Sequence, residues 1–211
     1  MCPGLVIGEK KTGHKKRVQG AKRVYEKENV MFNPQIGLLP ETTHLPSPNQ
    51  DERPNNTDID MIVIHGISLP PGQFGGDTIE RFFCNQLDTS GNPALADISH
   101  LKVSSHLLIK RTGEIVQFVP FTKRAWHAGE SFFEGRVRCN DFSIGIELEG
   151  TDDIPYEPVQ YKQLSRAILA IMQAYPKITI GRVVGHADIA PGRKTDPGAA
   201  FDWSYLKGML I

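Results

Sequence analysis

The stretch FSIGIELEG, residues 142–150, restricts the fold of this chain more than any other segment. Its polarity alternates with the period of an extended strand, in which successive side chains point to opposite faces. One face carries apolar side chains: Ile144, Ile146 and Leu148. The other carries small or acidic side chains: Ser143, Gly145, Glu147 and Glu149. We therefore expect a buried strand whose polar face can contribute to a site.

An amphipathic helix is predicted soon after this strand, at residues 158–175. It begins at Pro158 and ends before Pro176, and its apolar residues recur at helical spacing. Further strands are predicted at 59–66, 104–110, 114–120 and 181–186, and further helices at 78–87 and 201–210. Helices interleaved with strands in this way predict an α/β fold of the mixed α+β kind, with a single central mixed β-sheet flanked by helices.

Length and composition favour one domain, because 211 residues with 39% hydrophobic content suffice for one full core. We expect this domain to span residues 31–211, with an irregular, proline-rich surface stretch from Pro40 to Thr57. Residues 1–30 are polar and lack apolar periodicity, which predicts a basic, disordered N-terminal extension. They hold eight Lys/Arg and three Glu, a net charge of +5 that leaves −5 for the rest.

The basic extension is compatible with a tether to nucleic acid or to an anionic membrane, and also with a dispensable tail, which we favour. A negatively charged domain repels phosphates, so we expect no nucleic-acid partner and no membrane partner. The first residues lack the apolar stretch of a signal peptide, and no segment is apolar for long enough to span a bilayer. Three cysteines without C-x-x-C spacing argue against a disulfide framework. Together these features predict a cytoplasmic protein.

Two histidines follow apolar, strand-like runs and precede polar loops: His65 and His186. Loops at strand ends are where sheets of this kind form sites. A hydrolytic zinc site takes three protein ligands and leaves the fourth position to water, so one carboxylate would complete the set. Asp188 and Asp196 are both candidates. We favour Asp196, because the prolines and glycines between residues 191 and 198 can turn the chain back to the metal.

Two further residues are candidates for the remaining chemistry. Glu147, on the polar face of its predicted strand, is suited to act as general base for the water that the metal activates. Lys194 lies two residues before Asp196, so the same loop can bring its ammonium to a carbonyl oxygen that becomes negative. His106 and His127 are expected instead to be hydrogen-bonded structural or pocket-lining residues, because the tetrahedral site is already full.

Four stretches carry a resemblance to a known family: VIHGISLPPGQFGGD, VSSHLLIKRTGEIVQFVPF, KRAWHAGESFFEGRVRCNDFSIGIELEGTD and GHADIAPGRKTDPG. They closely resemble the cytoplasmic anhydro-N-acetylmuramyl-L-alanine amidases of Gram-negative bacteria, which are zinc enzymes of the amidase/peptidoglycan-recognition superfamily. The resemblance implies that Zn²⁺ is bound by His65, His186 and Asp196. It also implies that Glu147 is the base and that Lys194 stabilises the tetrahedral intermediate.

The implied substrate is an anhydro-muropeptide, a fragment released during turnover of the cell wall. The implied reaction is hydrolysis of the amide between anhydro-N-acetylmuramic acid and the L-alanine of the stem peptide, as part of peptidoglycan recycling. In many bacteria loss of this activity induces β-lactamase, so an indirect effect on that induction is implied too. The resemblance begins near residue 32 and leaves residues 1–30 outside. We expect a monomer.

The resemblance further implies substrate contacts. Trp126 would line the sugar pocket, and Arg138 and Arg193 would face carboxylates of the peptide. Lys102 is also expected to contact substrate, although the family often has arginine at its position. Gly66 stands where the family often has asparagine, and this departure removes a possible hydrogen bond to the peptide.

The alternative interpretation is a non-catalytic peptidoglycan-recognition module on the same fold. Such a module typically lacks a metal ligand, whereas all three candidate ligands are present in this chain. We therefore favour the enzyme. We also expect the loop at 69–76, which holds three glycines, to move when substrate enters.

Overall fold

The computed structural model describes residues 35–55 and 57–211, and the predicted N-terminal extension lies outside them. A six-stranded sheet forms the centre, in the order β1-β5-β4-β9-β3-β10. Its strands are β1 (Thr43–His44), β3 (Met61–Ile67), β4 (Leu107–Ile109), β5 (Ile115–Gln117), β9 (Ser143–Glu149) and β10 (Val183–Gly185). β4 and β5 pair antiparallel, and the other neighbouring pairs are parallel. The predicted mixed sheet is thus confirmed.

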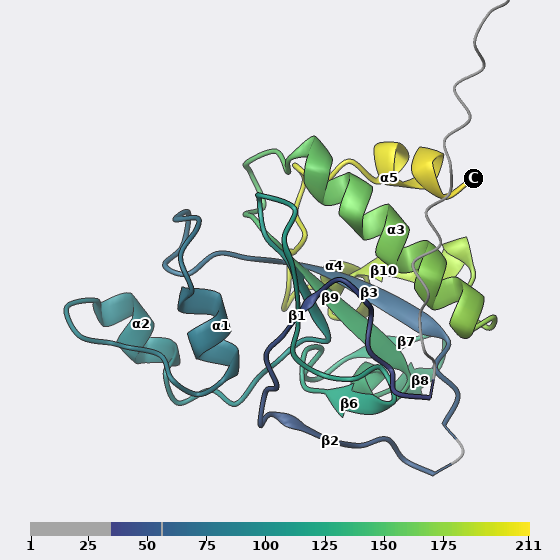
Figure 1. Cartoon of the computed structure of the whole chain (residues 1–211), viewed down its shortest axis with the longest axis horizontal. Coiled ribbons are helices and arrows are strands. Elements are labelled where there is room, and N and C mark those ends of the chain that lie inside the picture. Colours follow the sequence, from purple (N-terminus) through teal and green to yellow (C-terminus); the bar gives the residue numbers. More distant parts are fainter. Residues whose placement is uncertain (1–34, 56) are drawn as a thin grey trace, which may run out of the picture.

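Helices α3 (Pro158–Ala174) and α5 (Trp203–Leu210) lie together over one face of this sheet (Figure 1). α3 begins where the sequence predicted, because Pro158 occupies its first turn and Glu157 and Gln160 form a capping box. Three side chains of β9 belong to the apolar cluster beneath these helices: Ile144, Ile146 and Leu148. The apolar face predicted for this strand is therefore its contact with the helical layer.

The opposite face of the sheet is covered by two smaller apolar clusters. In the first, Phe82 and Phe83 of α1 (Thr78–Phe83) pack against Leu108 of β4. Helix α2 (Pro93–Ile98) lies beside α1, away from the sheet (Figure 1). The second cluster joins Met61 of β3 to Ile189 of the short helix α4 (His186–Ile189). The polar residues of β9 lie on this same side of the sheet.

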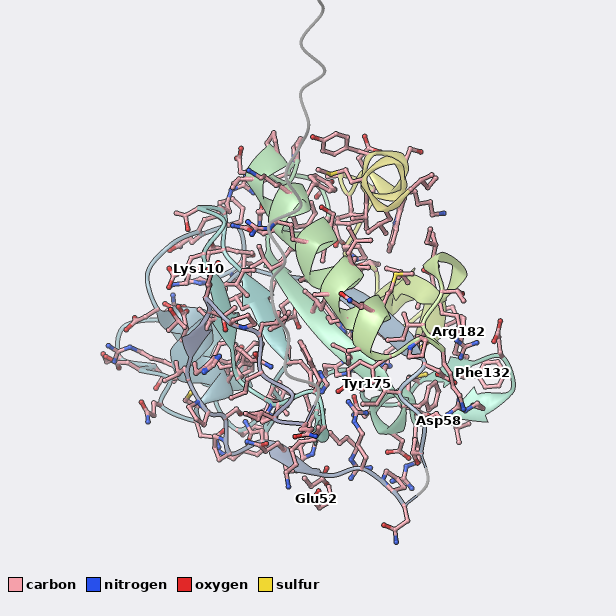
Figure 2. The ribbon with its side chains drawn as sticks, turned by 45° about the vertical axis from the view of Figure 1, so that its right-hand side comes forward. Glu52, Asp58, Lys110, Phe132, Tyr175 and Arg182 are labelled. Carbon is pink, nitrogen blue, oxygen red and sulfur yellow. The ribbon has the colours of Figure 1, made fainter. Side chains whose placement is uncertain are left out.

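Short elements complete the fold around the sheet. β2 (Gln50–Glu52) pairs with β6 (Lys123–Ala125), and β7 (Phe132–Phe133) pairs with β8 (Arg136–Val137). The 3-10 turns η1 (Cys139–Asp141) and η2 (Ile180–Arg182) precede β9 and β10. Figure 2 shows Phe132, on the β7–β8 hairpin, at the edge of the molecule opposite Lys110.

Several boundaries differ from the sequence predictions. Helix α1 ends before the predicted residue 87, because Asn85 adopts a left-handed backbone with φ of 58°. Helices α2 and α4 were not predicted; α2 starts at Asn92-Pro93, a pair that also signals a turn. Two short strands, β1 and β2, interrupt the stretch predicted to be irregular. Within the described residues, the helices are too short or too polar to cross a membrane.

Candidate metal centre and active site

The two candidate histidine ligands lie at the carboxyl ends of adjacent parallel strands. His65 is in the second half of β3, and β3 pairs with β10 in parallel. His186 follows β10 directly; it is the first residue of α4, so the predicted strand ends one residue earlier, at Gly185. Both imidazoles are almost fully buried. Parallel pairing brings together two side chains that are 121 positions apart in the sequence.

Three side-chain atoms converge at this point, and we name the residues that carry them the ligand cluster: His65, His186 and Asp196. The Nδ1 atoms of the two histidines are 2.9 Å apart. Asp196 Oδ2 lies 3.2 Å from His65 Nδ1 and 3.1 Å from His186 Nδ1. Tetrahedral zinc with bonds of about 2.0 Å separates its ligand atoms by roughly 3.3 Å. The spacing and the donor types both fit such an ion.

The structure separates the two candidate aspartates. Asp188 is exposed in the first turn of α4, and its Oδ2 accepts a hydrogen bond from Gly185 N at 2.7 Å. It therefore caps a helix, which agrees with a structural role. The chain returns at Asp196, whose backbone carbonyl accepts a hydrogen bond from Ala187 N at 3.0 Å. That return puts the Asp196 carboxylate, and not that of Asp188, beside both histidines.

Burial and mutual contact control the protonation of the ligand cluster. Burial lowers the pKa of His65 to about 4, which keeps this imidazole neutral near pH 7. Burial by itself would raise the pKa of Asp196, but its close contacts with His186 and His65 outweigh burial and lower that pKa. Neutral imidazoles and an ionised carboxylate are the forms that bind a metal ion.

Glu147 lies beside the ligand cluster on the polar face of β9. It pairs with His65 in the register of β9 and β3, and its Oε1 is 4.0 Å from His65 Nδ1. Its Oε2 is buried and has no hydrogen-bond partner among residues 35–55 and 57–211. Burial, and then the nearby charge of Asp196, raise the pKa of Glu147 well above its usual value. A buried carboxylate with a raised pKa and a free oxygen is suited to accept and release a proton.

Lys194 lies on the turn that returns the chain to Asp196. Its backbone N–H donates to the carbonyl of Ala190 at 3.0 Å, and its side chain is exposed. Its positive charge opposes the rise in the pKa of Glu147. Lys194 therefore acts electrostatically on the site while its ammonium remains accessible from solvent.

Two of the predicted substrate residues lie outside the ligand cluster. Trp126 is half-buried, and its backbone N–H donates to Ser104 Oγ at 3.2 Å. Lys102 is exposed, in the segment between α2 and β4. Their roles in binding substrate stay predictions.

The two predicted arginine contacts differ in how far their side chains are already engaged. Arg138 is exposed, with Nε 3.3 Å from Asp141 Oδ2. The Arg193 guanidinium donates to the carbonyls of Ala128, at 2.7 Å, and Glu130, at 2.5 Å. Arg193 thus also holds the segment after Trp126 against the turn before Asp196, and contact of either arginine with substrate stays a prediction.

Sequence motifs did not point to Tyr156, which is buried near the site. Tyr156 donates its hydroxyl proton to the carbonyl of Pro197 at 3.0 Å, and a Cβ at Gly66 would lie 2.3 Å from that hydroxyl. The hydroxyl of Tyr156 thus occupies the space that a side chain at Gly66 would need. The spacing of the two residues in the sequence does not reveal this contact. His106 and His127 are both buried and hydrogen-bonded, as predicted.

The chain is similar to several known proteins. A family model described as N-acetylmuramoyl-L-alanine amidase matches residues 55–199. The 1,6-anhydro-N-acetylmuramyl-L-alanine amidase AmpD of Escherichia coli (strain K12) is 54% identical over 174 residues, which are 82% of this chain and 94% of that protein. AmpD of Citrobacter freundii is 52% identical over 174 residues, which are 82% of this chain and 92% of that protein.

Solved structures show the same similarity. A crystal structure of a selenomethionine derivative of AmpD is 51% identical, with a TM-score of 0.81 and coverage of 83% of this chain and 98% of that chain. The amidase AmiD from E. coli, in complex with the substrate anhydro-N-acetylmuramic acid-L-Ala-D-gamma-Glu-L-Lys, is 34% identical, with a TM-score of 0.53. That match covers 76% of this chain and 61% of AmiD.

Proposed function

The chain belongs to the N-acetylmuramoyl-L-alanine amidase family, and on this premise we propose a specific reaction for it. It hydrolyses the amide between anhydro-N-acetylmuramic acid and the L-alanine of a stem peptide, with zinc held by the ligand cluster. The substrate class is that named for its AmpD relatives and bound by the related AmiD. The reaction serves peptidoglycan recycling, and we place it in the cytoplasm in a monomeric enzyme.

One observation carries this proposal. Three ligand atoms of the types that zinc prefers converge within 3.2 Å of one another, next to the buried Glu147 carboxylate. A zinc ion at that point would supply Lewis acidity, by lowering the pKa of the attacking water and polarising the scissile carbonyl. Structural zinc sites use a fourth protein ligand, whereas three ligands beside a free carboxylate are typical of a catalytic site.

Residues of the protein supply proton transfer, charge stabilisation and substrate binding. Glu147 accepts a proton from the attacking water and delivers it to the amide nitrogen as the C–N bond breaks. Its raised pKa favours the protonated state between these two steps. The ammonium of Lys194 offsets the negative charge that develops on the carbonyl oxygen. Contacts from Trp126, Arg138, Arg193 and Lys102 to the sugar and peptide complete the proposal.

The direct test is product analysis with an anhydro-muropeptide as substrate. Mass spectrometry should detect the free stem peptide and the anhydro-sugar, and elemental analysis should find zinc in the purified protein. Asp196→Ala should lose zinc and activity together. Asp188→Ala is the matched control and should keep most of both. Loss of metal in Asp188→Ala but not in Asp196→Ala would overturn the assignment of ligands.

Two further results would redirect the proposal. A protein without stoichiometric zinc that still binds muropeptide would instead be a recognition module. Faster turnover of intact sacculi than of anhydro-muropeptide would contradict the recycling role. Cell fractionation tests the proposed cytoplasmic location, and light scattering tests the proposed monomeric state. Deletion of residues 1–30 should leave the activity unchanged.

A further inference from the structure

A short chain of hydrogen bonds leads away from the ligand cluster on the side opposite the proposed metal. His65 Nε2 lies 2.9 Å from His127 Nδ1. His127 Nε2 lies 3.2 Å from Ser143 Oγ, and Ser143 Oγ lies 2.6 Å from the carbonyl oxygen of Cys139. This series of hydrogen bonds therefore connects a candidate metal ligand to a backbone carbonyl through two buried side chains. We name it the relay: His65, His127, Ser143 and the Cys139 carbonyl.

The chemistry of its last member fixes the proton positions along the relay. A carbonyl can only accept, so Ser143 must donate its hydroxyl proton to Cys139, and its Oγ is left to accept from His127. His127 then carries its proton on Nε2, and its Nδ1 is an acceptor. His65 must therefore carry its proton on Nε2, which leaves the lone pair of His65 Nδ1 facing the other members of the ligand cluster.

Packing holds His127 in this orientation. A Cβ on Gly145 would lie 2.4 Å from the His127 ring, so the ring occupies space that only a glycine on the polar face of β9 leaves open. The backbone N–H of His127 donates to Asn140 Oδ1 at 3.1 Å, and the ring of His106 meets it edge-on with centroids 5.7 Å apart. The imidazole is buried.

The residue after His127 does the same for the second histidine of the ligand cluster. Nε2 of His186 lies 3.2 Å from the carbonyl oxygen of Ala128, which can only accept, so His186 also carries its proton on Nε2. Ala128 N donates to the same Asn140 Oδ1 at 2.8 Å. The dipeptide His127-Ala128, held by Asn140, therefore fixes which ring nitrogen carries the proton in both His65 and His186.

We infer that His127 is a positioning residue, which holds His65 in the tautomer and orientation that present Nδ1 to a metal ion. Hydrogen-bond partners of metal-ligating histidines commonly fix the tautomer, and their loss typically weakens metal binding 10–100-fold. The inference rests on the proposed function, because it concerns the same metal site.

Zinc affinity, measured by competition with a chromophoric chelator, tests this inference without reference to turnover. His127→Phe keeps a ring but removes the acceptor, and we expect zinc binding about 10–100-fold weaker than in the unaltered protein. His127→Asn puts an amide oxygen near the position of Nδ1 and should restore much of the affinity. Ser143→Ala breaks the last link of the relay and should weaken binding less than His127→Phe.

A matched control comes from Ser105, which is also fully buried and donates its hydroxyl proton to a backbone carbonyl, that of Leu107. Ser105→Ala should leave the zinc affinity unchanged. Nitrogen NMR of the zinc-free protein should find His65 protonated on Nε2, and His127→Phe should shift that tautomer equilibrium. A merely structural role for His127 would change thermal stability but not the tautomer of His65.

The outcomes separate this inference from the proposed function. If the unaltered protein binds no zinc, the proposed function fails first. If it binds zinc and a folded His127→Phe protein binds it equally well, only the inference is overturned. If His127→Phe does not fold, the zinc affinities of Ser143→Ala and Ser105→Ala are compared instead. Equal affinities overturn the inference, and weaker zinc binding by Ser143→Ala alone supports it.

Discussion

The two faces of β9 are buried to a similar degree but are built from different chemistry. On the face toward α3, Ile144, Ile146 and Leu148 are each 0% exposed within one apolar cluster. On the face toward the ligand cluster, Glu147 and Glu149 are 8% and 3% exposed. Burial of carboxylates without ideal partners costs free energy, whereas burial of isoleucine gains it.

The difference lies in how replaceable each residue is. Apolar contacts are non-directional, so the face toward α3 tolerates other shapes of similar volume. Each residue of the polar face instead has a separate directional task. Ser143 ends the relay, Gly145 leaves room for His127, Glu147 keeps a free oxygen, and Glu149 accepts from the backbone N–H groups of Gly75 and Arg111. One face of the strand therefore supports stability and the other supports function.

Glu147→Gln should give the largest effect and separate the two faces most clearly. It keeps the shape but removes the proton acceptor, so we expect turnover to fall about 10²- to 10⁴-fold with zinc retained. Its folded stability near pH 7 should stay equal or rise, because the buried carboxyl with a raised pKa is gone. Steady-state kinetics, zinc analysis and urea unfolding check this. Unchanged turnover, or loss of zinc, would contradict the role given to Glu147.

Ile146→Ala should show the reverse pattern. Its side chain is fully buried under α3, so its truncation should lower the free energy of unfolding by about 2–5 kcal/mol. Turnover per folded molecule should remain close to normal. Ile146→Val is the graded control, with an expected cost of about 0.5–1.5 kcal/mol. A large loss of turnover at temperatures where Ile146→Ala is fully folded would show that the faces are not independent.

Acid should lower the folding stability of the metal-free protein through the residues on the polar side of the sheet. Between its ordinary pKa of 6.5 and its folded pKa of about 4, His65 binds a proton only when the chain is unfolded. His65 alone should therefore lower the free energy of unfolding by about 1.4 kcal/mol per pH unit as the pH falls through this window, and the buried His106 and His127, whose pKa values burial also lowers, add to this slope. Glu147 opposes this, because the folded chain takes up a proton there. The slope measured by urea unfolding should accordingly be steeper in Glu147→Gln.

A slope that is the same with and without Glu147 would contradict this account of the polar face. The apolar face provides the control, since Ile146→Val removes no titratable group. Its pH dependence should run parallel to that of the unaltered protein.

Glu149→Gln should have the smallest effect and should be local. The amide keeps an oxygen acceptor but loses the charge that binds the N–H groups of Gly75 and Arg111. We expect amide exchange at Gly75 to be about tenfold faster, which corresponds to about 1.4 kcal/mol. A product analogue should slow exchange in the loop at 69–76 if that loop closes over substrate. Equal exchange with and without the analogue would contradict the predicted motion.

The sequence predicted those parts of the fold whose signals are local. Alternating polarity identified β9 and assigned Glu147 to its polar face, and Pro158 marked the start of α3. The choice of Asp196 over Asp188 also rested on a local signal, since prolines and glycines turn a chain within a few residues. The structure brings Asp196 to both histidines on that basis.

The relay could not be predicted in the same way. His65 and His127 are 62 positions apart, and their contact depends on strand order and on the orientation of two rings. Likewise, α4 is four residues long, too short for its own sequence to indicate a helix before its packing is known. Contacts of this kind follow from the assembled sheet and not from any one segment.

The distance of 121 positions between His65 and His186 also has a consequence for the newly made chain. A ribosome releases residues in order, so β3, β4 and β9 leave it well before β10 and Asp196. The ligand cluster is therefore complete only after nearly the whole chain has been synthesised, and a metal ion that needs all three ligands can bind only then.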